Sequence, residues 1–93
     1  MSLEFEWNAR KAALNLRQHG ISFKEAATAF ADPRSLTVQD LEHSLAEDRF
    51  VLLGSSYRGR LLVVVHTERG DNLWIISARK ATKRERRQYG DQE

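Results

Sequence analysis

A run of five aliphatic residues in the second half of this 93-residue chain, Leu61-Leu62-Val63-Val64-Val65, constrains the fold more than any other feature. The run is far too short to cross a membrane, and its leucines and valines are typical of a buried strand. Successive side chains of a strand point to opposite faces of the sheet, so this strand needs cover on both faces. We therefore expect a central strand, with helices on one face and the last helix, a ligand or a partner chain on the other.

Three further segments have the composition of strands and are separated by short turns. Consecutive strands joined by such turns pair antiparallel, so the second half is predicted to be a four-stranded antiparallel meander. The candidate strands are Ser35 to Gln39, Arg49 to Tyr57, Arg60 to Arg69 and Asn72 to Ser77.

The first half is predicted to be helical after a short extended start at Phe5 to Trp7. Asn8 has the residue type that caps a helix, and Gly20 can adopt the left-handed conformation that ends one. Ser22 and Glu25 then have the spacing of a capping box, which predicts the start of a second helix. Alanine, leucine and phenylalanine residues recur at helical spacing in both segments, so both helices are expected to pack on the sheet.

A second capping box, Thr82 with Glu85, predicts a short final helix from about Lys83 to near Gly90. Helical stepping of about 100° per residue separates a broad arc of cations from Glu85 and Tyr89, which should face the sheet. The predicted fold is therefore one α+β domain over residues 1–93, with two N-terminal helices packed on the meander and a short basic helix at the C-terminus.

The positive charge of the chain is concentrated near this last helix. Residues 79–87 hold six Lys or Arg and one Glu, whereas residues 1–78 hold nine bases and ten acids. A local basic patch beside a sheet predicts a phosphate-bearing partner, most simply nucleic acid, and the alternative is a solvated basic face with no ligand. The chain has no cysteine, which excludes disulfides and thiol chemistry and fits a reducing cytoplasm. We expect a soluble cytoplasmic protein with no membrane association.

Several side chains are candidates for chemistry. Arg60 lies where the chain turns into the central strand, so its side chain can reach over the end of the sheet. His43 and Glu47 lie in a polar loop, where an imidazole can exchange protons near neutral pH. No histidines lie at ligand spacing and no acidic cluster has the pattern of a metal site, so neither a metal nor another cofactor is expected.

The chain resembles the BrnT family of type II toxins in stretches that occur in order along nearly its whole length. They are Phe5-Glu6-Trp7, Gln18-His19-Gly20-Ile21-Ser22-Phe23 with Glu25-Ala26, Asp32-Pro33, Asp40 with His43-Ser44 and Glu47, Gly59-Arg60, and Ile76-Ser77-Ala78-Arg79-Lys80-Ala81-Thr82 with Glu85 and Tyr89. The resemblance implies a fold similar to the RelE ribonucleases and a bacterial toxin that inhibits translation by cleaving RNA. It also implies a BrnA-type antitoxin with a DNA-binding domain, through which alone the toxin would reach operator DNA.

Under this resemblance, RNA cleavage without a metal would use the neighbouring 2′-hydroxyl as nucleophile, and arginines would stabilise the phosphate. Arg60 and Arg79 are then expected at the scissile phosphate, with His43 or Glu47 transferring the proton. Glu85 either caps the last helix, orients an arginine or acts as a general base. The expected RNA contacts are Lys80, Lys83, Arg84, Arg87, Arg49 and Tyr89. The competing hypothesis is a non-catalytic basic module that binds nucleic acid or an acidic protein.

Overall fold

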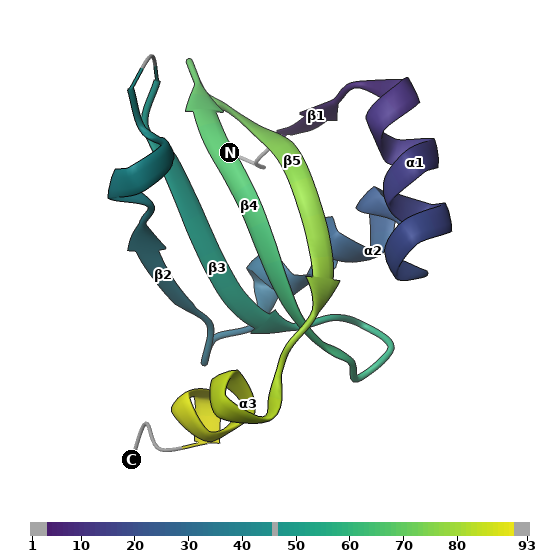
Figure 1. Ribbon diagram of the computed structural model, residues 1–93, viewed down its shortest axis with the longest axis vertical. Helices are drawn as coiled ribbons and strands as arrows, with labels where there is room; N and C mark the ends of the chain where they lie inside the picture. Colours follow the sequence, from purple (N-terminus) through teal and green to yellow (C-terminus); the bar gives the residue numbers. More distant parts are fainter. Residues whose placement is uncertain (1–3, 46, 91–93) are drawn as a thin grey trace.

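A five-stranded mixed sheet forms the scaffold of the protein in the computed structural model, which describes residues 4–45 and 47–90 (Figure 1). The strand order is β1-β5-β4-β3-β2, so β4 is central, as its doubly apolar run predicted. The strands are β1 (Glu4–Trp7), β2 (Leu36–Gln39), β3 (Arg49–Ser55), β4 (Leu61–Arg69) and β5 (Asn72–Lys80).

The predicted four-stranded meander is correct for β2 to β5 but incomplete. The extended start at Phe5 to Trp7 is part of a fifth strand, β1, which pairs with β5 in parallel, Phe5 opposite Leu73. Turn length predicts pairing only between strands that follow each other along the chain, and β1 is separated from β5 by two helices and three strands. The last strand also runs beyond Ser77 to Lys80, because Lys80 still pairs with β4.

Within the described residues, three α-helices and two short 3-10 turns complete the fold, and the main helices begin and end near the predicted positions. Asn8 caps the first helix through a hydrogen bond from Lys11, and Gly20 ends it with a positive φ of 70°. The elements are α1 (Ala9–His19), α2 (Phe23–Thr28), η1 (Ala29–Ala31), η2 (Leu41–His43) and α3 (Lys83–Gly90).

The helix-covered face of the sheet holds the larger core. Ile21, Phe23 and Ala26 from the first half pack there against Leu62 and other residues of β3, β4 and β5. The buried amide of Asn15 joins these layers, because it donates to the carbonyl oxygens of Ile21 and Ala78 and accepts from the Ala78 N–H. Figure 1 shows α2 behind the sheet and α3 below the strand ends.

We call the opposite side of the sheet the open face. Leu53, Leu61 and Val63 form a small cluster there, partly covered by Tyr89 of α3. The cover is incomplete, because the side chain of Val38 in the edge strand β2 is 63% exposed. The expectation that β4 would be covered on both faces is met, because its residues Leu61 and Val63 are buried on the open face as well, and the exposed apolar surface there belongs to the edge strand β2.

Candidate functional site

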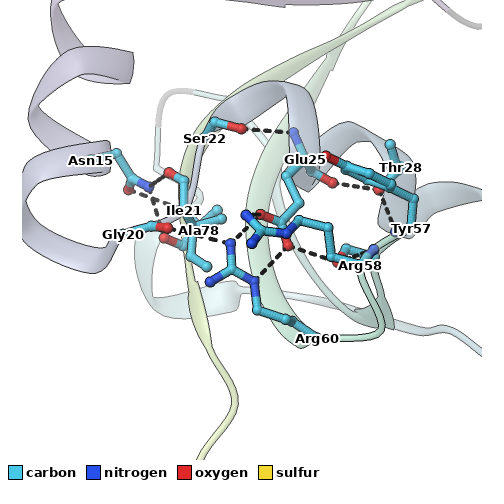
Figure 2. Close-up of polar contacts among 11 residues, drawn as sticks. Asn15, Gly20, Ile21, Ser22, Glu25, Thr28, Tyr57, Arg58, Arg60 and Ala78 are labelled. Carbon is cyan, nitrogen blue, oxygen red and sulfur yellow. Dashed lines mark hydrogen bonds and ion pairs between the residues drawn. The ribbon is translucent and has the colours of Figure 1, made fainter.

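Arg60, the leading candidate from the sequence, lies on the helix side and is bound by a buried carboxylate (Figure 2). Its Nε donates to Glu25 Oε2 at 2.8 Å, and its Nη2 donates to Glu25 Oε1. Glu25 is only 3% exposed and also accepts a 2.7 Å hydrogen bond from the Ser56 hydroxyl. The hydrogen bond from Arg60 is the largest cause that lowers the pKa of Glu25. The carboxylate therefore stays ionised inside the fold.

The predicted capping box at the start of α2 is only half formed. Ser22 does accept a hydrogen bond from the Glu25 N–H at 3.0 Å. The Glu25 side chain, however, binds Arg60 and Ser56 instead of returning to the Ser22 backbone. The burial of this glutamate is the physical reason, since a buried carboxylate requires a cation more than a helix start requires a second cap.

The turn between β3 and β4 is fastened to α2 by the same group of contacts. The Thr28 hydroxyl accepts from the Tyr57 N–H at 2.9 Å and donates to the Glu25 carbonyl oxygen. Arg58 lies 3.9 Å from Glu25 at a more exposed position (Figure 2). Arg60 thus has a clear structural role, and its predicted role at an RNA phosphate stays a prediction.

Arg79 forms the second arginine–glutamate pair, on the open face beside α3. Nη1 and Nη2 of Arg79 donate to the two Glu85 oxygens at 2.8 and 2.9 Å. Glu85 also completes a capping box, because its Oε1 accepts from the Thr82 N–H at 2.8 Å while Thr82 accepts from the Glu85 N–H. Capping the helix and orienting an arginine, two of the predicted alternatives for Glu85, are therefore both realised.

The pKa of Glu85 is lowered to about 2, first by the hydrogen bonds from Arg79 and further by the Thr82 N–H. A carboxylate with such a low pKa is a poor proton acceptor near neutral pH. The geometry therefore favours an orienting role for Glu85 over a role as general base.

Tyr89 faces the sheet, as predicted, and fixes α3 in place. Its hydroxyl donates to Asp32 Oδ2 at 2.6 Å, and the same oxygen accepts from the Ser55 N–H. Burial raises the pKa of Asp32, but the hydrogen bonds from Tyr89 and Ser55 outweigh it and lower the pKa overall. Nothing in the sequence pointed to this role of Asp32, because no spacing pattern links an acid beside Pro33 to a tyrosine in the last helix.

His43, Glu47 and Arg49 gather around a hollow at the other end of the sheet, with a volume of about 450 Å³. His43 Nδ1 lies 2.9 Å from the Asp40 carboxylate, at an exposed position. The Arg49 guanidinium makes no hydrogen bond or ion pair with any residue in the described part of the chain. Its positive charge is thus not neutralised by a carboxylate, in contrast to Arg60 and Arg79.

The open face connects this hollow to Arg79. Arg49 pairs with Thr67 and Arg79 pairs with Val63, so the two arginines are separated by four residues along β4, or roughly 13 Å at about 3.3 Å per residue. A second hollow of about 390 Å³ lies between them. It is lined by Leu36, Val38, Val51, Leu53, Val63, Glu85 and Gln88.

The predicted site residues therefore form three groups. Glu85 and Tyr89 belong to α3 and Arg79 lies beside it, close in sequence to the exposed cations Lys80, Lys83, Arg84 and Arg87. His43, Glu47 and Arg49 lie at the far end of the sheet, and Arg60 lies on the helix side. Among residues 4–45 and 47–90, no three acidic or histidine side chains are grouped to hold a metal ion. No helix in that part of the chain is long and apolar enough to span a membrane.

Comparison with known proteins assigns the family. The profile described as ribonuclease toxin, BrnT, of type II toxin-antitoxin system matches residues 7–85. The chain belongs to the BrnT family. The resemblance seen in the sequence is thereby confirmed, and the BrnT match includes Arg60, Arg79 and Glu85. As a member of this family, the chain is a ribonuclease toxin of a type II toxin-antitoxin system, and its partners are an RNA substrate and an antitoxin.

A solved structure supports the BrnT fold. The crystal structure of the Brucella abortus ribonuclease toxin, BrnT, aligns with a TM-score of 0.68 and 20% sequence identity, over 88% of this chain and 100% of that chain. At this identity the likeness establishes the α+β fold alone. No curated protein matches the chain. The roles of individual BrnT residues must therefore be argued from the geometry.

Proposed function

We propose that this toxin is a metal-independent endoribonuclease in which Arg79 contacts the scissile phosphate. The observation that carries the proposal is the pairing of Arg79 with an ionised Glu85 on the open face. Arg79 uses three N–H groups, two for Glu85 and one for the Lys80 carbonyl oxygen. Since a guanidinium has five N–H donors, two remain for a phosphate, and their direction is fixed by the pair.

Besides the RNA and the protein side chains, the chemistry requires only water, which accepts the proton of the 2′-hydroxyl. The 2′-oxygen attacks the adjacent phosphorus, its proton leaves to a base, and the bond from phosphorus to the 5′-oxygen breaks. The products are a 2′,3′-cyclic phosphate and a 5′-hydroxyl, which takes up a proton. An oriented arginine stabilises the additional negative charge that develops on the phosphate in the transition state. Lys80 and Lys83, both exposed, are proposed to guide the RNA backbone towards Arg79.

The predicted proton-transfer residues, His43 and Glu47, lie at the Arg49 end of the open face. From there they cannot reach a phosphate held by Arg79, some 13 Å away along the strand by the spacing of strand residues. Their catalytic role would thus require the scissile phosphate to lie at Arg49. We propose the Arg79 end for cleavage, because Glu85 orients Arg79, whereas no carboxylate of the described residues pairs with Arg49.

RNA cleavage by purified protein in the presence of a chelator tests the proposal. The wild-type protein should cut labelled RNA, and Arg79→Ala should lower the rate by about 10²-fold or more, since one charge-stabilising donor contributes that much. Arg17→Ala, an exposed arginine of α1, is the matched control and should cleave normally. Loss of cleavage on chelation, or an Arg79→Ala protein that cleaves like the wild type, would contradict the proposal. If His43→Ala lost cleavage and Arg79→Ala did not, the scissile phosphate would instead lie at Arg49.

In the cell, we propose that RNA cleavage inhibits translation and that a BrnA-type antitoxin neutralises the toxin. The cations of α3 are exposed, and so are the apolar residues Leu36 and Val38 of β2 on the open face. Both observations support a partner that covers these residues. Expression without antitoxin should stop growth, and light scattering of the co-expressed pair should show a stable complex. Operator DNA should bind to that complex and not to the toxin alone. Failure to form a complex would contradict this part of the proposal.

The alternative of a non-catalytic binding module is favoured by one observation, the row of exposed cations on α3. Under that alternative, RNA binding would weaken steeply with salt while the RNA stays intact under every condition tried. The cleavage assay with chelator separates the two.

A further inference from the structure

We propose that Arg69, stacked on Trp74, forms a stacking site for one unpaired nucleobase of single-stranded RNA. This inference rests on the proposed function, because it names a contact for the same substrate on the same face. It concerns the far end of the open face, away from Arg79. Neither residue was a candidate in the sequence analysis.

The first observation is a layered arrangement at the end of the sheet. The Arg69 guanidinium carbon lies 4.3 Å from the centroid of the Trp74 ring. Arg69 Nη2 also lies 3.3 Å from Glu47 Oε1, so a carboxylate holds the guanidinium over the indole. The guanidinium thus lies over one face of the indole. The Arg69 side chain is still 48% exposed, which leaves its other side open to a ligand.

The second observation is the row of residues to which Trp74 belongs. Thr67 of β4 pairs with Arg49 on one side and with Trp74 on the other. The three residues therefore lie across neighbouring strands, with Arg49 and Trp74 about 10 Å apart at about 4.8 Å per strand. Val51, two residues after Arg49 in β3, packs on the open face, so Arg49 points to that face too. Ile75 packs on the helix side, so its neighbour Trp74 points to the open face. Arg49 and Trp74 thus point to the same face.

The chemistry of this row matches the two parts of a nucleotide. A nucleobase offers a flat π surface, which stacks on aromatic rings and on arginine guanidinium planes. A phosphate offers negative charge, and Arg49 carries a positive charge that no carboxylate of the described residues neutralises. A base on Arg69 would place its own phosphate near Arg49. The remaining strand could then follow the open face towards Arg79.

The site should prefer an unpaired base without strong selection among the four. Bases within a duplex already stack on each other, so they cannot occupy an outer stacking position. Every base has a π face, and stacking alone reads no base edge. An acidic peptide could pair with Arg49 but would gain nothing from the stacked layer. Single-stranded RNA is therefore the occupant that uses both features.

Tryptophan fluorescence provides the test. The Trp7→Phe variant leaves Trp74 as the sole indole, because Trp7 packs against Phe23 on the helix side and is the other tryptophan. A short oligoribonucleotide with 2′-O-methyl groups binds without being cut, whichever residue is catalytic. We expect saturable quenching of Trp74 on titration. Adding Arg69→Ala should weaken binding about tenfold and reduce the quenching, whereas adding Arg17→Ala should change neither.

An oligonucleotide of the same length whose bases are all removed is the matched ligand control, and it should bind more weakly and leave Trp74 unquenched. If Trp7→Phe does not fold, the wild-type protein labelled with 5-fluorotryptophan gives separate resonances for the two indoles, and only that of Trp74 should shift. Binding without any change at Trp74, or an Arg69→Ala protein that binds and quenches like its parent, would overturn the proposal. So would quenching by an acidic peptide and none by RNA.

The two proposals fail in different ways. If the methylated oligonucleotide quenches Trp74 as expected but unmodified RNA is never cut, the stacking site stands and the cleavage proposal fails. If unmodified RNA is cut normally by Arg69→Ala and Trp74 never responds, the cleavage proposal stands and the stacking site fails.

Discussion

Of the arginine–glutamate pairs among residues 4–45 and 47–90, those of Arg60 with Glu25 and of Arg79 with Glu85 arise from the same local pattern and serve different ends. Glu25 and Glu85 both stand three residues after a helix-capping Ser or Thr, and both accept two hydrogen bonds from one arginine. Glu25 is almost fully buried, whereas the Glu85 side chain is 25% exposed. Glu25 binds an arginine 35 residues away, and Glu85 binds one only six residues away.

The difference in burial and sequence separation indicates that the first pair stabilises the fold and that the second orients a side chain. The pair of Glu25 and Arg60 joins α2 to the turn before β4, so breaking it leaves a buried charge. The pair of Glu85 and Arg79 connects neighbouring segments at the surface, where solvent screens the interaction. We infer that the first acts mainly on stability and the second mainly on the direction of Arg79.

The largest effect on stability is expected from Arg60→Ala. This change leaves the buried Glu25 carboxylate with Ser56 and a distant arginine, and the melting temperature should fall by roughly 10 °C or more. Thermal unfolding followed by circular dichroism measures it. Arg58→Ala is the matched control on the same turn and should change the melting temperature by no more than about 2 °C, because Arg58 is exposed and 3.9 Å away. Equal effects of the two changes would remove the distinction between the pairs.

A smaller effect is expected from Tyr89→Phe, which deletes the hydrogen bond to Asp32. Asp32 keeps the Ser55 and Arg34 N–H groups, so the melting temperature should fall by only about 3 to 5 °C. The same thermal scan provides the measurement. Because Tyr89 fixes α3 beside Arg79, RNA cleavage should also decline, by about two- to fivefold. A fall in stability as large as that of Arg60→Ala would show that α3 holds the fold as strongly as the buried pair does.

The smallest effect is a dependence on pH. The pKa of Glu85 is about 2 in the fold, below its ordinary value of 4.5, so its stabilising contribution is complete above pH 4.5 and is lost as the pH falls from 4.5 towards 2. The difference in melting temperature between wild type and Glu85→Gln should thus be constant above pH 4.5 and shrink below it. Burial lowers the pKa of His66, so both proteins also lose stability as the pH falls below about 6.5. That shared loss cancels in the difference. A difference that shrinks already above pH 5 would contradict the assignment.

The sequence predicted the parts of the fold that depend on neighbours in the chain. The aliphatic run identified β4 as the central strand, and the last helix turned Glu85 and Tyr89 inward as its angular pattern indicated. The parallel pairing of β1 with β5 could not be predicted, because two helices and three strands separate these two strands along the chain. The burial of Glu25 could not be predicted either, because its capping pattern is the same as that of Glu85 and the arginine that it binds lies 35 residues away.

The candidate site was predicted residue by residue but not as an arrangement. Arg60 and Arg79 were expected at one phosphate, yet they bind different carboxylates on opposite sides of the sheet. Their separation follows from strand alternation and from the long-range contact of Glu25. Arg69 and Trp74 escaped notice because they meet only across the turn between β4 and β5. The pairing of Arg69 with Asn72 places Trp74 diagonally opposite, a spacing that a hairpin register could have revealed.

RNA cleavage by two variants tests most directly whether the pair of Glu25 and Arg60 stabilises the fold while the pair of Glu85 and Arg79 orients the catalytic arginine. Glu25→Met with Arg60→Met replaces the buried pair by apolar side chains, which often preserves stability, whereas Arg79→Ala removes one partner at the surface. With labelled RNA and chelator, the account predicts that the double variant, once shown to be folded, cleaves within about threefold of the wild type. Arg79→Ala should fold and lose cleavage by about 10²-fold. A folded double variant without activity, beside an active Arg79→Ala, would contradict the account and assign the scissile phosphate to Arg60.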